Sequence, residues 1–498
     1  MSDTVLLHSD DDVAVALRDL KAGESLRVSA PSGDIAVTIA DEVPRGHKLA
    51  LRPIPAGRHV RKFGYSIGVA QADIPAGSWV HTHNVRTGLG GLLEYRYEPQ
   101  PTPAPQPKGH TFLGYERDNG EVGIRNEIWI LNTVGCINKT CELLARMGSN
   151  RFAGRGIDGV FHFAHPFGCS QLGDDLSFTK QLLASLAEHG NAAGVLIVGL
   201  GCENNQIAGM QELLGDGGGR IRYLRSQDEE DELEAGMELL EELVTYAERF
   251  ERKPIPLSKL KLGLKCGGSD GFSGITANPL VGRLADIVTA EGGTALLTEV
   301  PEMFGAETIL MNRSTNEEVF GKVVHLINDF KQYFIRHNQE IYENPSPGNK
   351  AGGITTLEEK SLGCTQKGGH ASVTDVLPYG VRASKPGLNL IQGPGNDLVS
   401  VTALAAAGAH IVLFTTGRGT PFGGPVPTVK LSTNSELAAK KKHWIDFDAG
   451  RLLSGASMDE LSQDLLTYVL GLASGTERTN GEKNGFREIA IFKDGVIL

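Results

Sequence analysis

The sequence predicts an α/β protein with a small β-rich domain at its N-terminus, and three observations lead to this prediction. Residues 1–97 consist of short apolar segments separated by glycine and proline turns. Residues 98–109 contain prolines at alternate positions. Beyond residue 110, apolar runs of strand length alternate with amphipathic stretches, a pattern typical of parallel sheets. We therefore expect an N-terminal domain (1–97), a linker (98–109), a middle α/β domain (110–253) and a C-terminal α/β domain (254–498).

The N-terminal domain is expected to be built from short strands and one helix. Strands are predicted at residues 25–30, 34–39, 48–54 and 64–70, and a short helix at Val13–Leu20. The linker EPQPTPAPQP should adopt an extended polyproline conformation and act as a semi-rigid spacer.

Alternating strands and helices are expected in the two larger domains. The predicted strands of the middle domain are 127–134, 159–163, 194–200 and 220–224, with helices at 177–188 and 227–252. Residues 253–259 (KPIPLSK) are interpreted as a second linker. The predicted strands of the C-terminal domain are 261–264, 294–297, 388–391, 411–415 and 428–431. The segment 341–369 is too long for an idle connection, since such loops are usually functional or disordered.

Composition indicates an ordinary globular chain that acts on small molecules. The net charge of −12 and the pI near 5.7 argue against partners such as nucleic acid or an anionic membrane surface. The first residues lack a secretory signal, and no apolar run approaches the length of a membrane span. Six cysteines without a CxxC pair make a disulfide framework improbable. We therefore expect a cytoplasmic protein.

Four predicted strands are followed by a cysteine set among glycines: Cys136, Cys169, Cys202 and Cys266. Ligands of α/β proteins bind beyond the carboxyl ends of parallel strands. Thiolates from several such loops could converge on one metal such as iron or zinc. The alternative is that each cysteine is a small buried residue at a strand end. We expect the set of four to form a metal site.

Other loops gather polar groups at high density. The loop 266–279 contains Asn278, the segment 298–307 contains Glu299, and Lys350 lies between glycines. Arg418 and Thr420 follow the strand 411–415, where an arginine suits bidentate binding of a carboxylate or phosphate. A dinucleotide site is not expected, because GLGCENN lacks the third glycine of the Gly-x-Gly-x-x-Gly pattern and no Walker motif occurs.

Three histidines of the N-terminal domain are candidates for acid–base chemistry. His81 and His83 would point to the same face of a strand, a spacing that can chelate a metal or present an acid–base pair. His47 lies between two predicted strands, beside Lys48. The alternative is that all three are surface or half-buried loop residues.

Together these motifs resemble the altronate/galactarate dehydratase family along essentially the whole chain. The specific pieces are GHK, VHTHN, GCSQLGDD, GLGCENNQ, CGGSDGFSGITANP, TEVPEMFGAE, NPSPGNKAGG, TTGRGTPFGG and NSELAAKKKHWIDFDAG. VHTHN and TEVPEMFGAE match the altronate branch. The resemblance implies an N-terminal β-clip (SAF-type) domain, a middle domain that forms a homodimer, and a Rossmann-like C-terminal domain. It also implies dependence on ferrous iron or manganese.

The activity implied is dehydration of D-altronate to 2-dehydro-3-deoxy-D-gluconate in hexuronate catabolism. We assign the expected catalytic residues as His47, Lys350, Glu299, His83 and His81. The expected substrate-binding residues are Arg418, Asn278, Asn349, Thr420 and Arg125. The expected metal ligands are Cys169, Cys202, Cys266 and Cys136. They would hold a single metal ion, and the alternative is that cysteines of this set hold an iron–sulfur cluster.

Two alternatives remain open at this point. The chain could dehydrate galactarate or another sugar acid, because a small change in a polar pocket can switch specificity. It could also be a sugar-acid-binding protein without enzymatic activity, since β-clip domains serve as binding modules.

Overall fold

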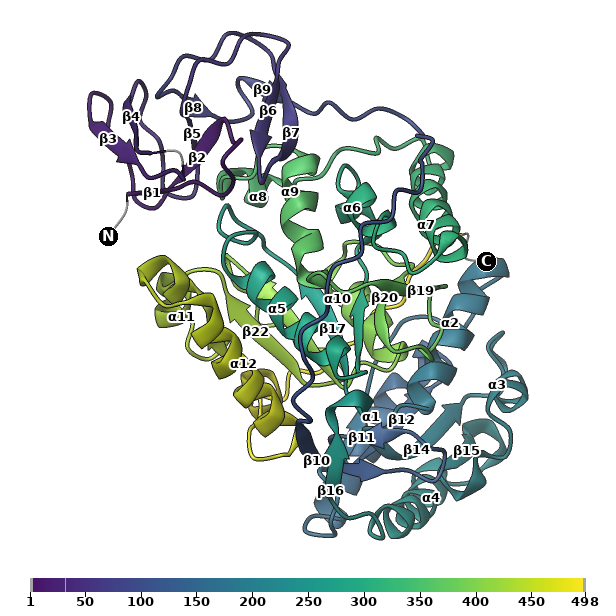
Figure 1. The fold of residues 1–498 in the computed structure, drawn as a ribbon. Coiled ribbons are helices and arrows are strands. Elements are labelled where there is room, and N and C mark those ends of the chain that lie inside the picture. Colours follow the sequence, from purple (N-terminus) through teal and green to yellow (C-terminus); the bar gives the residue numbers. More distant parts are fainter. Residues whose placement is uncertain (1–2, 32, 496–498) are drawn as a thin grey trace.

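The computed structural model describes residues 3–31 and 33–495 and contains three bodies in a row (Figure 1). A small antiparallel β domain lies at one end, a large parallel sheet with helices occupies the centre, and a second parallel sheet lies at the other end. The predicted α/β fold class, with a small β domain at the N-terminus, a middle α/β domain and a C-terminal parallel-sheet domain, is confirmed. Among the described residues, no helix is long and apolar enough to cross a membrane.

The N-terminal domain is made of short antiparallel strands. One sheet has the order β1 (Thr4–Val5), β2 (Val13–Ala16), β5 (Lys48–Ala50) and β8 (Trp79–Val80). The others are β3 (Ser25–Val28) with β4 (Ile35–Thr38), and β6 (His59–Lys62), β7 (Tyr65–Ala70) and β9 (Val85–Arg86).

The helix predicted at Val13–Leu20 is wrong. Residues Val13–Ala16 form strand β2, in which all four side chains are buried. This strand pairs with β1 and β5, so both of its edges are hydrogen-bonded. The two valines fit a pleated, buried strand, and tertiary pairing therefore overrides the weak helical pattern.

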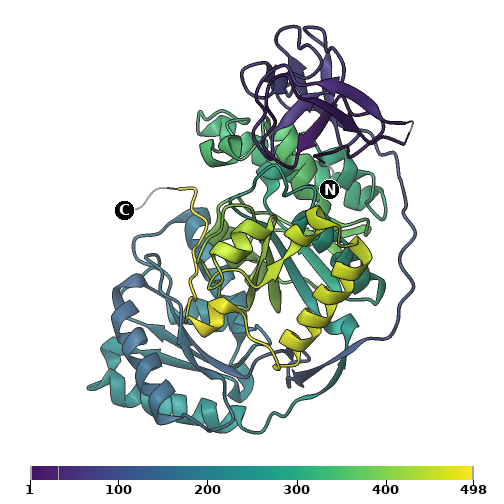
Figure 2. The same ribbon diagram turned by 90° about the vertical axis from the view of Figure 1, so that its left-hand side faces the viewer.

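The linker runs along the surface of the C-terminal domain as an extended chain (Figure 2). Residues 87–110 contain no helix or strand. The chain is nevertheless held in place, because Gln100 N donates to Asn312 O at 2.8 Å and Tyr97 Oη donates to Ser314 O at 2.7 Å. The proline-rich segment is therefore a docked strap.

The middle domain is a parallel sheet of order β13-β12-β14-β15 with helices α1–α4. Its strands are β12 (Glu127–Asn132), β13 (Gly159–His162), β14 (Ala192–Gly199) and β15 (Ile221–Arg225). Its helices are α1 (Asn138–Arg151), α2 (Gly173–Ala187), α3 (Ile207–Leu214) and α4 (Glu232–Ala247).

The second linker predicted at 253–259 is wrong, because Lys253–Pro256 form strand β16. This strand pairs with β10 (Thr111–Glu116), which in turn pairs with β11 (Val122–Gly123). Strand β16 lies at the edge of this sheet, where proline is tolerated because one side needs no N–H donor.

The C-terminal domain is built on seven parallel strands in the order β19-β20-β18-β17-β21-β22-β23. They are β17 (Lys261–Cys266), β18 (Thr294–Leu297), β19 (Val373–Leu377), β20 (Gly387–Ile391), β21 (Ile411–Thr416), β22 (Thr428–Ser432) and β23 (Phe447–Asp448). The helices are α5 (Ala277–Ala290), α6 (Glu307–Met311), α7 (Glu317–Arg336), α8 (Pro347–Ala351), α9 (Leu357–Cys364), α10 (Asp397–Ala406), α11 (Ser435–Lys440), α12 (Met458–Ala473) and α13 (Asn480–Lys483).

The two parallel sheets meet at their amino ends. Asn191, just before β14, donates to the carbonyl of His410, just before β21, at 3.3 Å. His410 Nε2 lies 2.7 Å from Val122 O. The N-terminal domain instead covers helices α8 and α9 beyond the other end of the central sheet (Figure 1). The carboxyl edges of the two sheets are therefore separate places in the molecule.

Candidate active site

The candidate site lies beyond the carboxyl ends of β17, β18 and β21 in the C-terminal domain. The strand order reverses at β17, which has β18 on one side and β21 on the other. Such switch points are where ligands bind in open α/β sheets. The loops after β17 and β21 pack together, since the N–H groups of Gly417 and Arg418 both donate to Gly268 O.

A buried network of lysines and glutamates fills this edge. Lys265, at the end of β17, forms ion pairs with Glu299 and, at 3.1 Å, with Asp397. Lys367 lies 3.0 Å from the second oxygen of Glu299. Lys360 pairs with Glu302 at 2.9 Å. Burial alone would lower the pKa of each lysine, but the neighbouring anions outweigh it and raise all three pKa values, so the ammonium groups stay charged.

Glu299 has unusual properties for a proton-transfer residue in this network. Its backbone is left-handed, with φ of 68°, a conformation that costs a non-glycine residue about 1–3 kcal/mol. Burial raises the pKa of Glu299 to about 7 against the pull of Lys265 and Lys367. Strained backbone and a pKa near neutrality both occur at catalytic sites.

Two cysteines lie in the same network. Cys364 Sγ donates to Glu302 Oε2 at 3.1 Å, and Cys266 Sγ lies 2.7 Å from Ser269 Oγ. A hydrogen bond from Cys364 lowers the pKa of Cys266, while it raises the pKa of Cys364. Burial would raise the pKa of Glu302, but Lys360 and its neighbours lower it to about 2. Glu302 is thus an anion next to cationic lysines, and the pKa of Cys266 is shifted in the same direction.

The N-terminal domain closes over this edge through two buried lysines. Lys48 and Lys62 reach Glu359 of α9 at 2.9 and 2.8 Å, and Lys48 also donates to Gly353 O at 2.8 Å. Thr355 N donates to the same glutamate at 2.8 Å. Burial would raise the pKa of Glu359, but Lys48 and Lys62 lower it to about 2. One carboxylate therefore holds two cations that come from another domain.

The predicted histidines gather around Trp79. The indole Nε1 donates to His47 Nδ1 at 3.2 Å, which leaves His47 Nε2 facing Ala351 O at 3.4 Å. The ring of Trp79 stacks on His81 and contacts His83. His81 Nδ1 lies 3.0 Å from Thr355 Oγ1. Burial lowers the pKa of His47, and lowers that of His81 to about 4, so both rings are neutral at neutral pH.

Glycines make the close approach of the two domains possible. A Cβ on Gly271 would lie 2.0 Å from Gly46 O, and a Cβ on Gly353 would lie 2.3 Å from it. Gly271 N also donates to Gly352 O at 2.7 Å. The Gly46 carbonyl of the N-terminal domain is thus wedged between two loops of the C-terminal domain.

The expected substrate-binding residues lie beside this network in different states. Asn278 is buried and bonded through both amide atoms, to Thr415 and to Gly363 O. Asn349 accepts from Lys360 at 3.1 Å and donates to Ser269 O at 2.9 Å. Arg418 is exposed and donates to Gly348 O at 3.3 Å. Both asparagines therefore position neighbours, whereas the other donors of Arg418 have no partner among the residues that the structure describes.

Lys350 and Thr420 are half-buried in the same region. Lys350 lies on α8, directly after Asn349, and Thr420 Oγ1 accepts from Phe422 N at 3.3 Å. The histidines, Glu299, Cys266 and these polar residues are thus brought to one region by the fold.

Arg125 lies elsewhere. It precedes β12, is buried, and donates to Glu482 at 2.8 Å and to Leu472 O at 2.9 Å. Its guanidinium therefore ties the middle domain to the C-terminal helices, at the amino end of the sheet. The expectation that it binds substrate is replaced by a structural role.

The four predicted cysteine ligands do not converge. Cys266 is in the C-terminal domain, whereas Cys136, Cys169 and Cys202 follow β12, β13 and β14 of the middle domain. Because the two sheets meet at their amino ends, their carboxyl edges cannot share one ion. Among the described residues, no group of three or more His, Cys, Asp or Glu side chains could hold a metal ion. The expectation of one four-cysteine site is wrong for that reason.

The lysine–glutamate network does not fit a mononuclear divalent metal as it stands. Each carboxylate that a metal would need is already neutralised by ammonium groups: Glu299 by Lys265 and Lys367, and Glu302 by Lys360. A cation placed among them would be repelled by three charged lysines.

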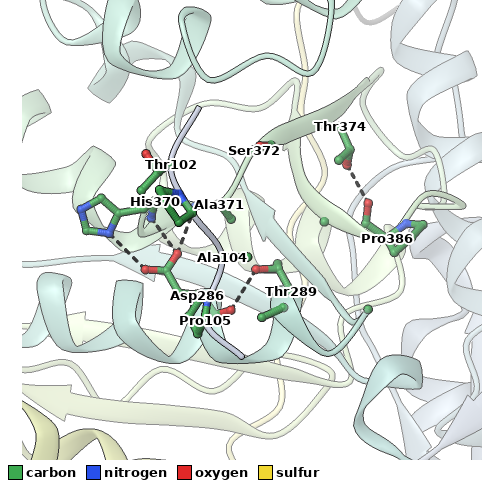
Figure 3. Close-up of a pocket in the computed structure, with 14 residues that line it drawn as sticks. Thr102, Ala104, Pro105, Asp286, Thr289, His370, Ala371, Ser372, Thr374 and Pro386 are labelled. Atoms are coloured by element: carbon green, nitrogen blue, oxygen red, sulfur yellow. Dashed lines mark hydrogen bonds and ion pairs between the residues drawn. The ribbon is translucent and has the colours of Figure 1, made fainter. Parts of the chain in front are cut away.

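Little space is left where the N-terminal domain covers the network, although a separate cavity of about 470 Å³, lined by Leu7, Tyr65 and Arg313 among others, also lies between the two domains. The cavity bounded by Lys62, Asp270, Asn278, Glu359 and Lys360 has a volume of only about 10 Å³. A larger cavity of about 280 Å³ lies between the linker and α5 (Figure 3). There Asp286 already accepts hydrogen bonds from the backbone N–H groups of His370 and Ala371 and contacts the His370 ring. The network site is thus closed, and the linker cavity lacks a comparable set of reactive groups.

Sequence reasoning missed most of the charged residues at the site. They are Lys48, Lys62, Lys265, Glu359, Lys360 and Lys367, and the thiol of Cys364 was missed with them. Glu302 lies in the polar segment 298–307 that the sequence pointed to, but no role was assigned to it. Two features of the sequence could have revealed the missed residues. The first is Lys265, which lies at the end of an apolar strand, where a buried charge needs a partner. The other was the sequence LEEKSLGCTQK inside the long segment 341–369, which forms α9 and the turn after it.

Comparisons with known proteins match all three domains. Residues 2–88 match the model of the altronate/galactarate dehydratase SAF domain. Residues 114–248 match the second domain of D-galactarate dehydratase/altronate hydrolase, and residues 257–497 match the D-galactarate/altronate dehydratase C-terminal domain.

Full-length relatives are also similar to the chain. Altronate dehydratase of Escherichia coli strain K12 is 55% identical over 99% of both chains, and that of Bacillus subtilis strain 168 is 52% identical over 100% of both. Galactarate dehydratase (L-threo-forming) of E. coli is 32% identical over 98% of this chain and 96% of its own. Among solved structures, carbon monoxide dehydrogenase IV of Carboxydothermus hydrogenoformans matches 61% of this chain and 59% of its own at 9% identity, with a TM-score of only 0.19.

Proposed function

The chain belongs to the D-galactarate/altronate dehydratase family, and we propose that it dehydrates D-altronate to 2-dehydro-3-deoxy-D-gluconate. The choice of substrate rests on sequence identity. Over the whole chain, the identity to two altronate dehydratases is above 50%, whereas the identity to galactarate dehydratase is 32%. The buried network at the carboxyl edge of the C-terminal sheet supports hydro-lyase chemistry at that place.

Dehydration of a sugar acid needs a base for the C2 proton and positive charge for the resulting enediolate. Glu299, whose pKa is about 7, is suited to take that proton at neutral pH. The ammonium groups of Lys265 and Lys367 already flank its carboxylate. In a water-free site, fixed charges of this kind stabilise developing negative charge strongly.

The leaving C3 hydroxyl needs a proton, and the substrate carboxylate needs an anchor. Neutral His47 and His81 of the N-terminal domain carry ring protons at the domain boundary and are our candidates for the acid. Among the described residues, Arg418 retains donors without a partner in a planar fork, which suits the carboxylate. Lys350 follows Asn349 directly, and Thr420 is two residues after Arg418. Both are therefore candidates to contact the hydroxyl groups of the substrate.

A closed site implies that the N-terminal domain opens to admit substrate. The cavity of about 10 Å³ is far smaller than the several hundred Å³ of ordinary ligand pockets. Closure would then exclude water and bring the histidines over the bound acid. This would make the N-terminal domain part of the enzyme, since its Lys48 and Lys62 complete the covering of the network.

Metal dependence, a homodimer and a cytoplasmic location are further proposals. Because the network is neutralised by lysines, we derive no step from a metal there. Activity after chelation and after return of ferrous iron or manganese tests the dependence, light scattering tests the dimer, and cell fractionation tests the location.

The central test is a panel of sugar acids assayed for formation of 2-keto-3-deoxy acids under anaerobic conditions. We expect turnover of D-altronate well above that of galactarate and D-mannonate. Preference for galactarate would move the chain to the sister activity, and binding without turnover of any acid would favour a binding protein. Arg418→Lys should raise KM and lower kcat/KM at unchanged thermal stability, because lysine keeps the charge but loses the fork.

A further inference from the structure

The middle domain carries a second constellation of reactive groups, at the carboxyl edge of its own sheet. Strands β13, β12 and β14 are adjacent and parallel. The loop beyond each of them contains a glycine–cysteine pair. These pairs are Gly135–Cys136, Gly168–Cys169 and Gly201–Cys202. The mechanism proposed above uses none of these cysteines.

The three loops are packed against each other through the residues next to the cysteines. Gly135 N donates to Phe167 O at 2.8 Å, and both Asn204 N and Asn205 N donate to Gly168 O at 3.1 Å. A Cβ on Gly168 would lie 2.0 Å from Thr133 O, so only glycine permits the contact. The backbone therefore holds three cysteines in neighbouring turns at one edge.

Exposure separates these cysteines from the others in the described chain. Cys136, Cys169 and Cys202 are exposed, whereas Cys141, Cys266 and Cys364 are buried. Free cysteine is among the residues most often buried, and an exposed thiol is a liability because it oxidises. Three exposed thiols on three adjacent loops are thus not accounted for by packing.

Hydrogen-bond donors lie near two of the three cysteines, Cys202 and Cys169. Gln227 Nε2 lies 3.7 Å from Cys202 Sγ, and Arg225 Nη2 donates to Gly201 O at 2.9 Å. Gln171, two residues after Cys169, is 1% exposed, and its Nε2 has no hydrogen-bond partner among the described residues. Donors and a positive charge are what a group of anionic sulfur atoms requires.

We propose that Cys136, Cys169 and Cys202 bind a four-iron iron–sulfur cluster through three of its irons. Cysteine thiolates are the usual ligands of such clusters. A single ion fits poorly, because no three of these side chains in the described residues could hold one ion. A cluster spans a wider gap, since each thiolate binds a different iron. The fourth iron would remain open to an external oxygen ligand.

The site is independent of the lysine–glutamate network and of the proposed function. It lies on a different sheet, and cluster content is measured without turnover. A chain that binds a cluster but fails the altronate assay would therefore contradict the proposed function alone. A chain that turns over altronate without any cluster would contradict this inference alone.

The test uses the full-length chain, purified anaerobically and reconstituted with ferrous iron and sulfide. We expect about four irons and four acid-labile sulfides per chain, visible absorption that dithionite bleaches, and an electron paramagnetic resonance signal after reduction. The triple variant C136S/C169S/C202S should lose all of these signals. Cys141→Ala, a buried cysteine of α1 in the same domain, should retain them.

Two outcomes would overturn the inference. One is reconstituted wild-type chain without bound iron and sulfide. The other is a triple variant that retains the cluster while its circular dichroism and melting temperature match the wild type. The single variants C136S, C169S and C202S provide a second measurement, because each should contain less iron and sulfide per chain than Cys141→Ala.

Discussion

Replacement of Glu359 by glutamine should release the N-terminal domain from the catalytic domain. Glu359 holds Lys48 at 2.9 Å and Lys62 at 2.8 Å, and all three side chains are nearly fully buried. Glutamine has the same shape but no charge. The variant therefore leaves two buried ammonium groups without a counter-ion at the boundary between the domains.

The expected size of the effect follows from the burial of these charges. Breaking a buried ion pair by removing one partner costs about 3–5 kcal/mol. At about 1.4 kcal/mol per factor of ten, the docking equilibrium should shift by roughly 140- to 3,700-fold. The neighbouring Glu358 is the matched control for the loss of the ion pairs, because it is also buried and also contacts the N-terminal domain, but through the neutral donors Thr87 Oγ1 and Gly88 N.

Three measurements check this prediction. Small-angle scattering should show a larger radius of gyration for Glu359→Gln, limited proteolysis should cut faster within residues 87–110, and kcat/KM for D-altronate should fall by at least tenfold. Glu358→Gln should change each value much less. If the two variants behave alike in scattering, proteolysis and kinetics, the ion triad does not hold the domains together.

Three further predictions follow from the contacts at the site and between the domains. Gly271→Ala should lower kcat/KM, because the new Cβ would lie 2.0 Å from Gly46 O and push the two domains apart. Gly321→Ala is the control, since a Cβ there meets open space. Equal kcat/KM for the two variants would refute the close packing of Gly46 between the loops. If Glu299 is the base, kcat should rise with pH up to about 7, because the protonated carboxyl below that pKa cannot accept a proton; Glu299→Gln should lower kcat by about 10²–10⁴. A flat pH profile would remove Glu299 from that role. Arg125→Met should lower the melting temperature with KM unchanged, and a selective rise in KM would restore a substrate role.

The sequence was most informative where local pattern and tertiary structure agree. Apolar runs at 294–297, 388–391 and 411–415 correspond to β18, β20 and β21 almost residue for residue, because central parallel strands are buried on both faces. It failed at Val13–Ala16 and at Lys253–Pro256. Both are strands because of a partner far along the chain, which local composition does not reveal.

The candidate site shows the same limit more strongly. Lys265, Glu299 and Lys367 are close in space but come from β17, from the end of β18 and from the turn after α9. Nothing local marks a lysine as the partner of a glutamate more than thirty positions away. The cysteines illustrate the opposite error, in which similar local sequences were expected to lie together. The four glycine-flanked motifs belong to two sheets, and the carboxyl edges of these sheets are separate.

The strap between the domains also bears on how substrate reaches the network. The chain is anchored after residue 94, where Tyr95 Oη donates to Glu307 at 2.5 Å and Tyr97 Oη donates to Ser314 O at 2.7 Å. Of the residues between the last strand of the N-terminal domain and this anchor, the seven at 88–94 (GLGGLLE) include three glycines. Gly88 N donates to Glu358 at 2.7 Å and Tyr342 Oη donates to Gly91 O at 3.1 Å, so these two bonds must break when the domain lifts. Seven extended residues span roughly 20–25 Å. This short glycine-rich segment is therefore long enough for the domain to lift off the network while the proline-rich strap stays docked.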